Sequence, residues 1–216
     1  MKNQKAAGSE NAYTGIVIQR LKGKESIHMA LDMLIPRNIQ NDDVIYLCIG
    51  TDRSTGDSLA PLVGTYLKGL GYTNVYGSLD EPVHAQNLQE TINSLPQNKS
   101  IIAIDAGLGS ISSVGTTQVI KGSIKPGAGV NKIFPSYGDY SIMGIVNVGG
   151  FMEYFVLQST RLSLVMKMAK DITSAIVERF PLEYKKDKRS VRNYRDEVLV
   201  KRIKKKGLEA KLVKNK

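Results

Sequence analysis

The sequence lacks the features of secreted and membrane proteins. Its 216 residues include a single cysteine, Cys48, which excludes an internal disulfide and fits a reducing cytoplasm. No apolar run approaches the roughly 20 residues that a membrane helix requires, so we expect no membrane partner. The opening residues "MKNQKAAGSENAYTG" lack the apolar stretch of a secretory signal, and we therefore expect a cytoplasmic protein.

Histidine is scarce as well, with two in the chain. The pattern puts His28 on a helix and His84 in the first turn of another, so we do not expect a histidine-containing metal site. The glycine-rich segments "IDAGLGS" and "PGAGV" lack the spacing and the lysine of a phosphate-binding loop. We expect neither a metal nor another cofactor.

The formal net charge of +10 is concentrated at one end of the chain. Residues 181–216 contain 14 Lys or Arg and 5 Asp or Glu, a net of +9, which leaves +1 for the other 180 residues. Such a tail is a candidate for weak contact with nucleic acid, or a solvated extension without a partner. We expect a disordered segment at 1–13, one α/β domain at 14–180, and this basic tail at 181–216.

Apolar strands alternate with amphipathic helices in the body of the chain. Helical spacing of apolar residues is found in "ESIHMALDMLIP", "SLAPLVGTYLKGLG" and "PVHAQNLQETINSL", the last opening with Pro82. The strand candidates are "DVIYLCI", "TNVYGSL", "SIIAID" and "IMGIVNVGG". Strands that are apolar on both faces and separated by helices indicate a parallel sheet covered on both sides. We predict a three-layer α/β/α sandwich with a mostly parallel, doubly wound sheet.

Two segments depart from this alternation. Residues 110–139 are rich in Gly, Ser and Pro and contain one strand-like piece, "TTQVIKGSI", so we expect a loop that forms part of a functional cleft. Residues 153–180 read as one long helix. Its predicted core-facing residues are Leu162, Val165, Met166, Ala169, Ile172 and Ile176.

Two acidic residues stand where apolar strands are predicted to end. Asp105 terminates "IIAID", and Asp57 lies in the polar turn "IGTDRSTGDSL" after "VIYLC", where the next helix begins. Ligands of a parallel α/β sheet bind beyond the carboxyl ends of its strands, so both side chains can reach one crevice. Neighbouring carboxylates share a proton, and one can then act as a base while the other acts as an acid. The helix dipole favours ionised Asp57, and the apolar strand favours protonated Asp105.

Structural roles are the alternative for each acid. Asp57 can be a helix N-cap, and Asp105 can shape a turn through bonds from its side chain to the backbone. Asp52 and Arg53 can pair with each other or face solvent.

Three segments carry a resemblance to a known family. "IGTDRSTGDSLAP", "IIAIDAGLGS" and "TTQVIKGSIKPGAGVNK" resemble, in this order, three segments of the spore germination protease family. The length and the first segment are closer to the sporulation protein YyaC family. The resemblance implies the fold shared by the germination protease and the hydrogenase maturation proteases. It also implies a sporulation protein of the developing spore, a peptidase acting on small acid-soluble spore proteins.

The motifs carry the family's paired aspartates onto Asp57 and Asp105. Around them we expect substrate-binding residues in the three segments. These are Gly50, Thr51, Asp52, Gly107, Thr116, Pro126, Gly127 and Gly129. Gly56 stands where the family has proline, and the second segment continues as "AGLGS". A non-catalytic sporulation protein that keeps the fold and binds a protein or nucleic-acid partner is the alternative, and a homo-oligomer is left open.

Overall fold

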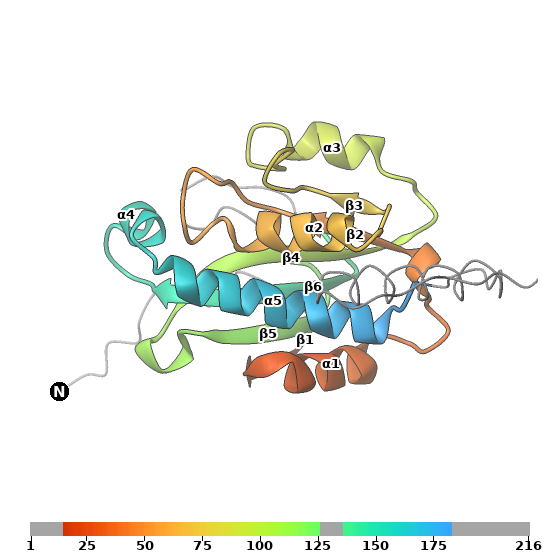
Figure 1. Cartoon of the computed structure of the whole chain (residues 1–216), viewed down its shortest axis with the longest axis horizontal. Coiled ribbons are helices and arrows are strands. Elements are labelled where there is room, and N and C mark those ends of the chain that lie inside the picture. The colour runs from red at the N-terminus through yellow and green to blue at the C-terminus, as the bar shows by residue number, and fades with distance from the viewer. Residues whose placement is uncertain (1–14, 126–135, 183–216) are drawn as a thin grey trace, which may run out of the picture. The chain divides into compact units, whose positions relative to one another are not determined.

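The computed structural model describes residues 15–125 and 136–182 (Figure 1). The chain divides into two units, Met1–Leu182 and Glu183–Lys216, and every described residue belongs to the first. The N-terminal segment 1–13 and all but the first two residues of the basic tail therefore lie outside the described residues.

The described residues form a six-stranded sheet in the order β1-β5-β6-β4-β2-β3. The strands are β1 (Ile16–Leu21), β2 (Val44–Cys48), β3 (Val75–Tyr76), β4 (Ser100–Gly109), β5 (Thr116–Lys121) and β6 (Tyr140–Val148). The pairs β2–β3, β2–β4 and β4–β6 are parallel, whereas β5 is antiparallel to both of its neighbours. The prediction of a mostly parallel sheet is confirmed.

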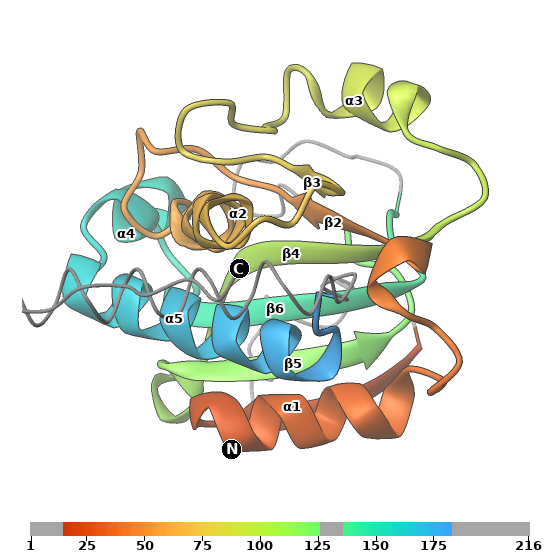
Figure 2. The ribbon, with the colours of Figure 1, turned by 45° about the vertical axis from the view of Figure 1, so that its right-hand side comes forward.

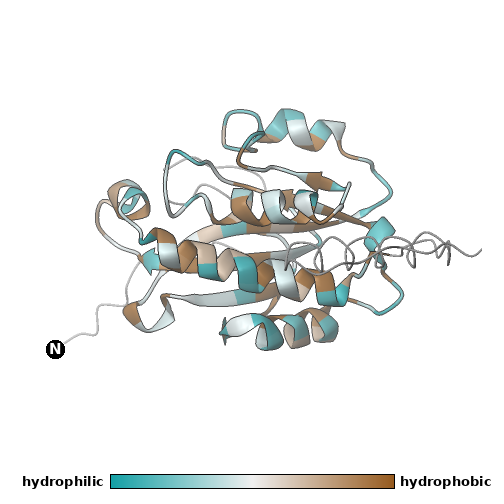
Figure 3. Cartoon of the chain, in the orientation of Figure 1, coloured by the Kyte–Doolittle hydropathy of each residue, from teal (hydrophilic) through white to brown (hydrophobic). Residues whose placement is uncertain are grey.

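Helices cover both faces of this sheet. They are α1 (Gly23–Leu34), α2 (Leu59–Gly69), α3 (Leu88–Ser94), α4 (Glu153–Gln158) and α5 (Leu162–Arg179), with short 3-10 helices at Asn41–Asp43 and Ile111–Ser113. In two views α1, α5 and α2 lie in a row across one face (Figures 1 and 2), with apolar residues on the strands behind them (Figure 3). Leu88 of α3 packs with Leu47 and Ile49 in a separate cluster, on the opposite face. This is the predicted α/β/α arrangement.

The buried strand β2 is apolar because it faces a core on each side. Tyr46 and Cys48 belong to the large core under α1, α2 and α5, while Leu47 belongs to the cluster under α3. The strand that follows β2 in sequence, β3, is added on one side of it, and the next, β4, on the other. Strand addition thus reverses at β2, which makes the carboxyl end of the β2–β4 pair the place where a doubly wound sheet binds ligands.

The prediction of one helix over 153–180 is wrong, because α4 ends and α5 begins within it. The carbonyls that would continue α4 are taken by neighbouring segments: Asn147 donates to Val156 O at 3.2 Å, and Gly56 N–H donates to Leu157 O at 2.9 Å. Residues 165, 169, 172 and 176 are buried as predicted. Leu162 is 55% exposed and Met166 is 36% exposed, so these two are not core residues.

The predicted helix that opens with Pro82 is also wrong in its first half. Val83 forms a parallel bridge with Ile49, which keeps the chain extended at that point. The Asn87 side chain accepts a hydrogen bond from His84 N–H at 2.8 Å and donates to Pro82 O at 3.0 Å. These bonds hold 82–87 in a turn, so His84 precedes α3.

The segment 110–139 contains the predicted strand, and its residues 126–135 lie outside the described residues. Its strand-like piece is β5, which lies inside the sheet between β1 and β6, and Ile124 bridges to Tyr137 beyond it. Strand β1, which the sequence pattern did not indicate, pairs with the outer side of β5.

Helix α2 lies unusually close to the sheet at one position. A Cβ on Gly64 would lie 1.9 Å from the carbonyl oxygen of Gly77, the residue after β3, and a Cβ on Gly77 would lie 2.0 Å from Cys48 O. Both contacts are with backbone, so the first cannot be relieved without shifting α2, and the second cannot be relieved without shifting the chain after β3 on which α2 lies. The position of α2 against the sheet, and the position of the turn that precedes α2, therefore depend on these two glycines.

We expect Gly64→Ala to lower the free energy of unfolding by roughly 2–3 kcal/mol, because the added methyl group overpacks a backbone contact. Gly69, at the end of the same helix, has open space where its Cβ would lie. Gly69→Ala is therefore the matched control and should be neutral or stabilising by up to about 1 kcal/mol. Urea unfolding of both variants measures the difference. Equal effects of the two substitutions would show that the contact at Gly64 is not a constraint.

Candidate functional site

The turn after β2 closes on itself and carries the first predicted acid. Gly50 N–H donates to Val83 O at 2.8 Å, and Thr51 N–H donates to Asp57 O at 3.3 Å. Gly50 has φ +154, and a Cβ there would lie 2.1 Å from Asp57 O, so the closure requires glycine. Ser58 is the N-cap residue of α2. Asp57 is therefore not the N-cap, and its carboxyl group is available for another role.

The second acid does not end a strand, as the sequence pattern predicted. Strand β4 continues to Gly109 because its last residues pair with β6. Strand β2 is shorter: Cys48 pairs with Ile104, so Asp105 is the first residue of β4 beyond that pairing. Its Oδ1 accepts the N–H of Ala106 at 2.8 Å. The bond from side chain to backbone that we considered is present, but in a strand and not in a turn.

Both carboxyl groups are partly buried, and the pKa of each is raised. Burial raises the pKa of Asp57, and the Ser54 hydroxyl opposes this by favouring the charged form. The pKa of Asp105 is raised well above its usual range, first by burial and then by the charge of Asp57, against the opposing bond from Ala106. The two carboxyl groups thus lie close enough to interact.

The repulsion between the two groups belongs to the pair and is expressed in the second ionisation. Asp57 ionises first, while Asp105 is still protonated and neutral, so Asp105 does not disfavour that step. When Asp105 loses its proton, Asp57 already carries a charge and opposes the loss. The environment therefore separates the two titrations, with Asp57 as the more acidic member.

Two polar side chains that we did not predict also belong to this region. Ser54, 5% exposed, lies beside Asp57 without meeting the geometry of a hydrogen bond, and its Oγ has no hydrogen-bond partner among the described residues. The buried Oε1 of Gln118 on β5 likewise has no partner in the described part of the chain. Little in the sequence distinguished these two residues. Ser54 is one of several hydroxyl residues in the turn, and Gln118 is a single amide in the apolar segment "TTQVIKG".

The sheet brings several predicted residues into two adjacent rows on one face. The register across β4, β6 and β5 gives the rows Asp105–Met143–Gln118 and Gly107–Ile145–Thr116. Gly107 has no side chain, so it does not cover the adjacent row that contains Asp105. The Thr116 hydroxyl is satisfied within its own segment, since it donates to Ser113 O at 2.7 Å.

The other predicted substrate-binding residues do not all lie in these rows. Gly50 and Thr51 lie at the closure of the turn, as described. Asp52 and Arg53 are exposed on that turn, and no ion pair joins them in the described structure. Pro126, Gly127 and Gly129 lie outside the described residues.

Among the described residues there is no group of three or more His, Cys, Asp or Glu side chains arranged to hold a metal ion. His28 lies 3.8 Å from Asp32 on α1. His84 Nδ1 accepts the N–H of Gln86 at 3.3 Å in the turn before α3. Neither histidine is joined to the two acids by a contact of the described structure.

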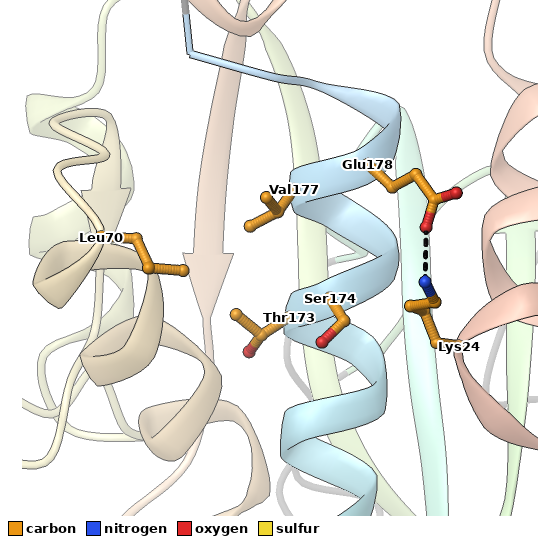
Figure 4. Close-up of a pocket in the computed structure, with 6 residues that line it drawn as sticks. All are labelled: Lys24, Leu70, Thr173, Ser174, Val177 and Glu178. Atoms are coloured by element: carbon orange, nitrogen blue, oxygen red, sulfur yellow. Dashed lines mark ion pairs between the residues drawn. The ribbon is translucent and has the colours of Figure 1, made fainter. Parts of the chain in front are cut away.

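A pocket of about 330 Å³ lies elsewhere, between α1, α2 and α5. Figure 4 shows Leu70 on one side, Thr173 and Val177 of α5 facing it, and the ion pair of Lys24 with Glu178 on the other. In this pair Lys24 Nζ lies 3.0 Å from Glu178 Oε2. It adjoins the carboxyl end of α2, whereas Asp57 precedes the amino end, roughly 16 Å away along the helix. The pocket is therefore separate from the acid pair.

In the ranges that the structure describes, none of the helices combines the length and the apolar character that a bilayer span requires.

The chain has relatives among known proteins. It is 53% identical over 145 residues to an "Uncharacterized protein YyaC" of Bacillus subtilis (strain 168), over 65% of this chain and 71% of that protein. This likeness supports the resemblance to the YyaC family. No solved structure matches the chain. A family model described as "Protein of unknown function (DUF1256)" matches residues 19–175, which is more than half of the sequence, and the chain belongs to this family.

Proposed function

We propose that the protein is a peptidase that hydrolyses peptide bonds in spore proteins, with Asp57 and Asp105 as its catalytic residues. The observation that carries the proposal is the placement of Asp105 just beyond the end of its pairing with β2, where the turn that holds Asp57 begins and where the charge of Asp57 raises the pKa of Asp105. Paired carboxyl groups with separated titrations supply an acid and a base at the same pH. The relation to the germination protease is part of this proposal and rests on the three sequence segments.

The proposed reaction uses the difference between the two groups. Asp57, ionised first, takes a proton from a water molecule as the water oxygen attacks the carbonyl carbon of the peptide bond. Asp105, kept protonated, gives its proton to the amide nitrogen as the carbon–nitrogen bond breaks. One water is consumed, a carboxylic acid and an amine leave, and the proton moves from Asp57 back to Asp105 through solvent.

The remaining expectations belong to the same proposal. Substrates are small acid-soluble spore proteins in the cytoplasm of the developing spore. Gly50 and Thr51 contact the backbone of Asp57, and Gly107 follows Asp105 on the same face of β4, so these three would contact the peptide. Neither a metal nor another cofactor takes part in the proposed steps.

A binding role without catalysis is the second candidate, and one surface favours it. Phe151, Met152, Tyr154 and Phe155 are 85%, 51%, 52% and 56% exposed, around the start of α4. This helix contacts the turn of Asp57 through the bond from Gly56 to the α4 carbonyl of Leu157. Exposed aromatic side chains gathered on one segment are typical of a protein-binding surface.

We expect the purified chain to cleave small acid-soluble spore proteins with a bell-shaped dependence of kcat/KM on pH. The rate should rise as Asp57 ionises and fall as Asp105 loses its proton. Asp57→Asn and Asp105→Asn should each lower kcat/KM by about 10²–10⁴-fold. Gel electrophoresis of the products across acidic to neutral pH gives the measurement.

Asp42→Asn is the matched control for this assay. Asp42 is exposed and precedes β2, so it lies at the opposite end of that strand from the acids, and its substitution should leave cleavage unchanged. Retained cleavage in both Asn variants of the acid pair would refute the catalytic proposal. Binding of spore proteins without cleavage by the wild type would favour the second candidate.

The raised pKa of Asp105 also predicts the stability of the protein against pH. Below about pH 4, both the folded and the unfolded chain hold this proton, so it has no effect. As pH rises toward the folded pKa, the unfolded chain releases the proton first, and stability is lost. Asp105→Asn removes this loss, and its oxygen can still accept the Ala106 N–H.

We therefore expect Asp105→Asn to raise Tm by roughly 2–4 °C at pH 7, and the gain to vanish toward pH 4. Thermal unfolding by circular dichroism across this range is the measurement, with Asp42→Asn as the variant that should show no gain. A variant less stable than the wild type at pH 7 would mean that the Asp105 carboxylate stabilises the fold.

A further inference from the structure

We propose that Gln118 is a substrate-binding residue whose side-chain amide holds a peptide group of the substrate beside Asp105. The inference rests on the proposed function. It adds a contact with the backbone of an extended polypeptide substrate, which does not depend on the amino-acid sequence of that substrate. It follows from the place of Gln118 in the sheet and from an unpaired buried atom.

The register of the sheet puts Gln118 in the same row as Asp105. Gln118 on β5 is paired with Met143 on β6, and Met143 is paired with Asp105 on β4. Neighbouring strands lie about 4.8 Å apart, so the two Cα atoms are separated by roughly 10 Å. Met143, which lies between them, is 7% exposed, so a peptide that contacts both side chains would lie over this covered position.

The two side chains share one face of the sheet. Val119 packs in the large core under α1, α2 and α5, whereas Ile120 packs with Ala103 and Met143 in the cluster on the opposite face. Alternation along a strand puts Gln118 on the face of Ile120, and Asp105 on the face of Ala103. The amide and the acid therefore point to the same side.

The buried Oε1 of Gln118 has no hydrogen-bond partner among the described residues. Buried polar atoms in native proteins are almost always paired, and an unpaired one requires an explanation such as a ligand or water. Thr116, two residues earlier on the same face, shows the usual solution, because its hydroxyl bonds to Ser113 O. The backbone of β5 is paired with β1 on one side and with β6 on the other. The side-chain amide of Gln118 is therefore not required to complete the hydrogen bonding of the strands.

A peptide group is the ligand that this amide matches. The carboxamide of Gln118 has one acceptor and two donors and carries no charge. A peptide N–H can donate to Oε1, and its carbonyl can accept from the side-chain nitrogen, whereas a charged ligand would need an opposite charge. In the next row a Cβ on Gly107 would lie 2.9 Å from Met143 Sδ, so the Met143 side chain lies against this part of β4.

The test measures binding separately from cleavage. The probe is fluorescein-labelled lysozyme, reduced and carboxymethylated so that it is an unfolded polypeptide, and fluorescence anisotropy gives Kd for the full chain carrying Asp105→Asn. Adding Gln118→Met, which keeps the size and removes the amide, should weaken binding about tenfold. The same change should raise Tm, because it removes an unpaired buried oxygen. The exposed Gln89 supplies the control, and Gln89→Met should leave Kd unchanged.

A second measurement needs no substitution at the site. The side-chain amide resonance of Gln118 in the ¹⁵N spectrum of the wild type should shift when N-methylacetamide, a model of the peptide group, is added. Unchanged Kd in Gln118→Met, or a lower Tm with an unshifted resonance, would overturn the inference. Cleavage that persists with unchanged Kd would refute the role of Gln118 alone, and amide-dependent binding without cleavage would refute the peptidase alone.

Discussion

The close approach of α2 to the β2–β3 pair is the constraint on which the rest of the structure depends. Gly64 meets the backbone of Gly77, and Gly77 meets that of Cys48, so the helix lies directly on the strands. The turn between β2 and α2 must then be compact, and it closes through Gly50 and the carbonyl of Asp57. A bulkier residue at any of these glycines would move the helix, and with it the first acid, away from β4.

The second acid depends on a difference in strand length. Strand β4 continues past the end of β2 because β6 pairs with it on the other side, and Asp105 lies just beyond Ile104, the last residue paired with β2. The sheet thus holds a carboxyl group rigidly in a partly buried place where it opposes folding at neutral pH. An acid whose ionisation is opposed in this way is typical of functional sites, where perturbed pKa values gather.

Much of the fold could be read from local pattern, and the errors arose where long-range contacts replaced local ones. The apolar runs of β2 and β6 and the spacing of α1 and α2 were sufficient to predict those elements. Helix 153–180 divides because Asn147 and Gly56, which both lie outside this segment, take the carbonyls that would continue α4. Val83 is extended because it bridges to Ile49. These partners lie outside the segments whose structure they change, so the hydrophobic period within each segment could not predict their effect.

The sequence by itself determined the α/β class, the mostly parallel sheet and the two acids as candidates, because hydrophobic period and turn composition are local properties. Only the tertiary structure decided that the charge of Asp57 reaches Asp105, since that requires the reversal of strand order at β2. It also decided the face and the row of Gln118, because register across three strands is set by packing of the whole sheet and is not encoded in any one segment.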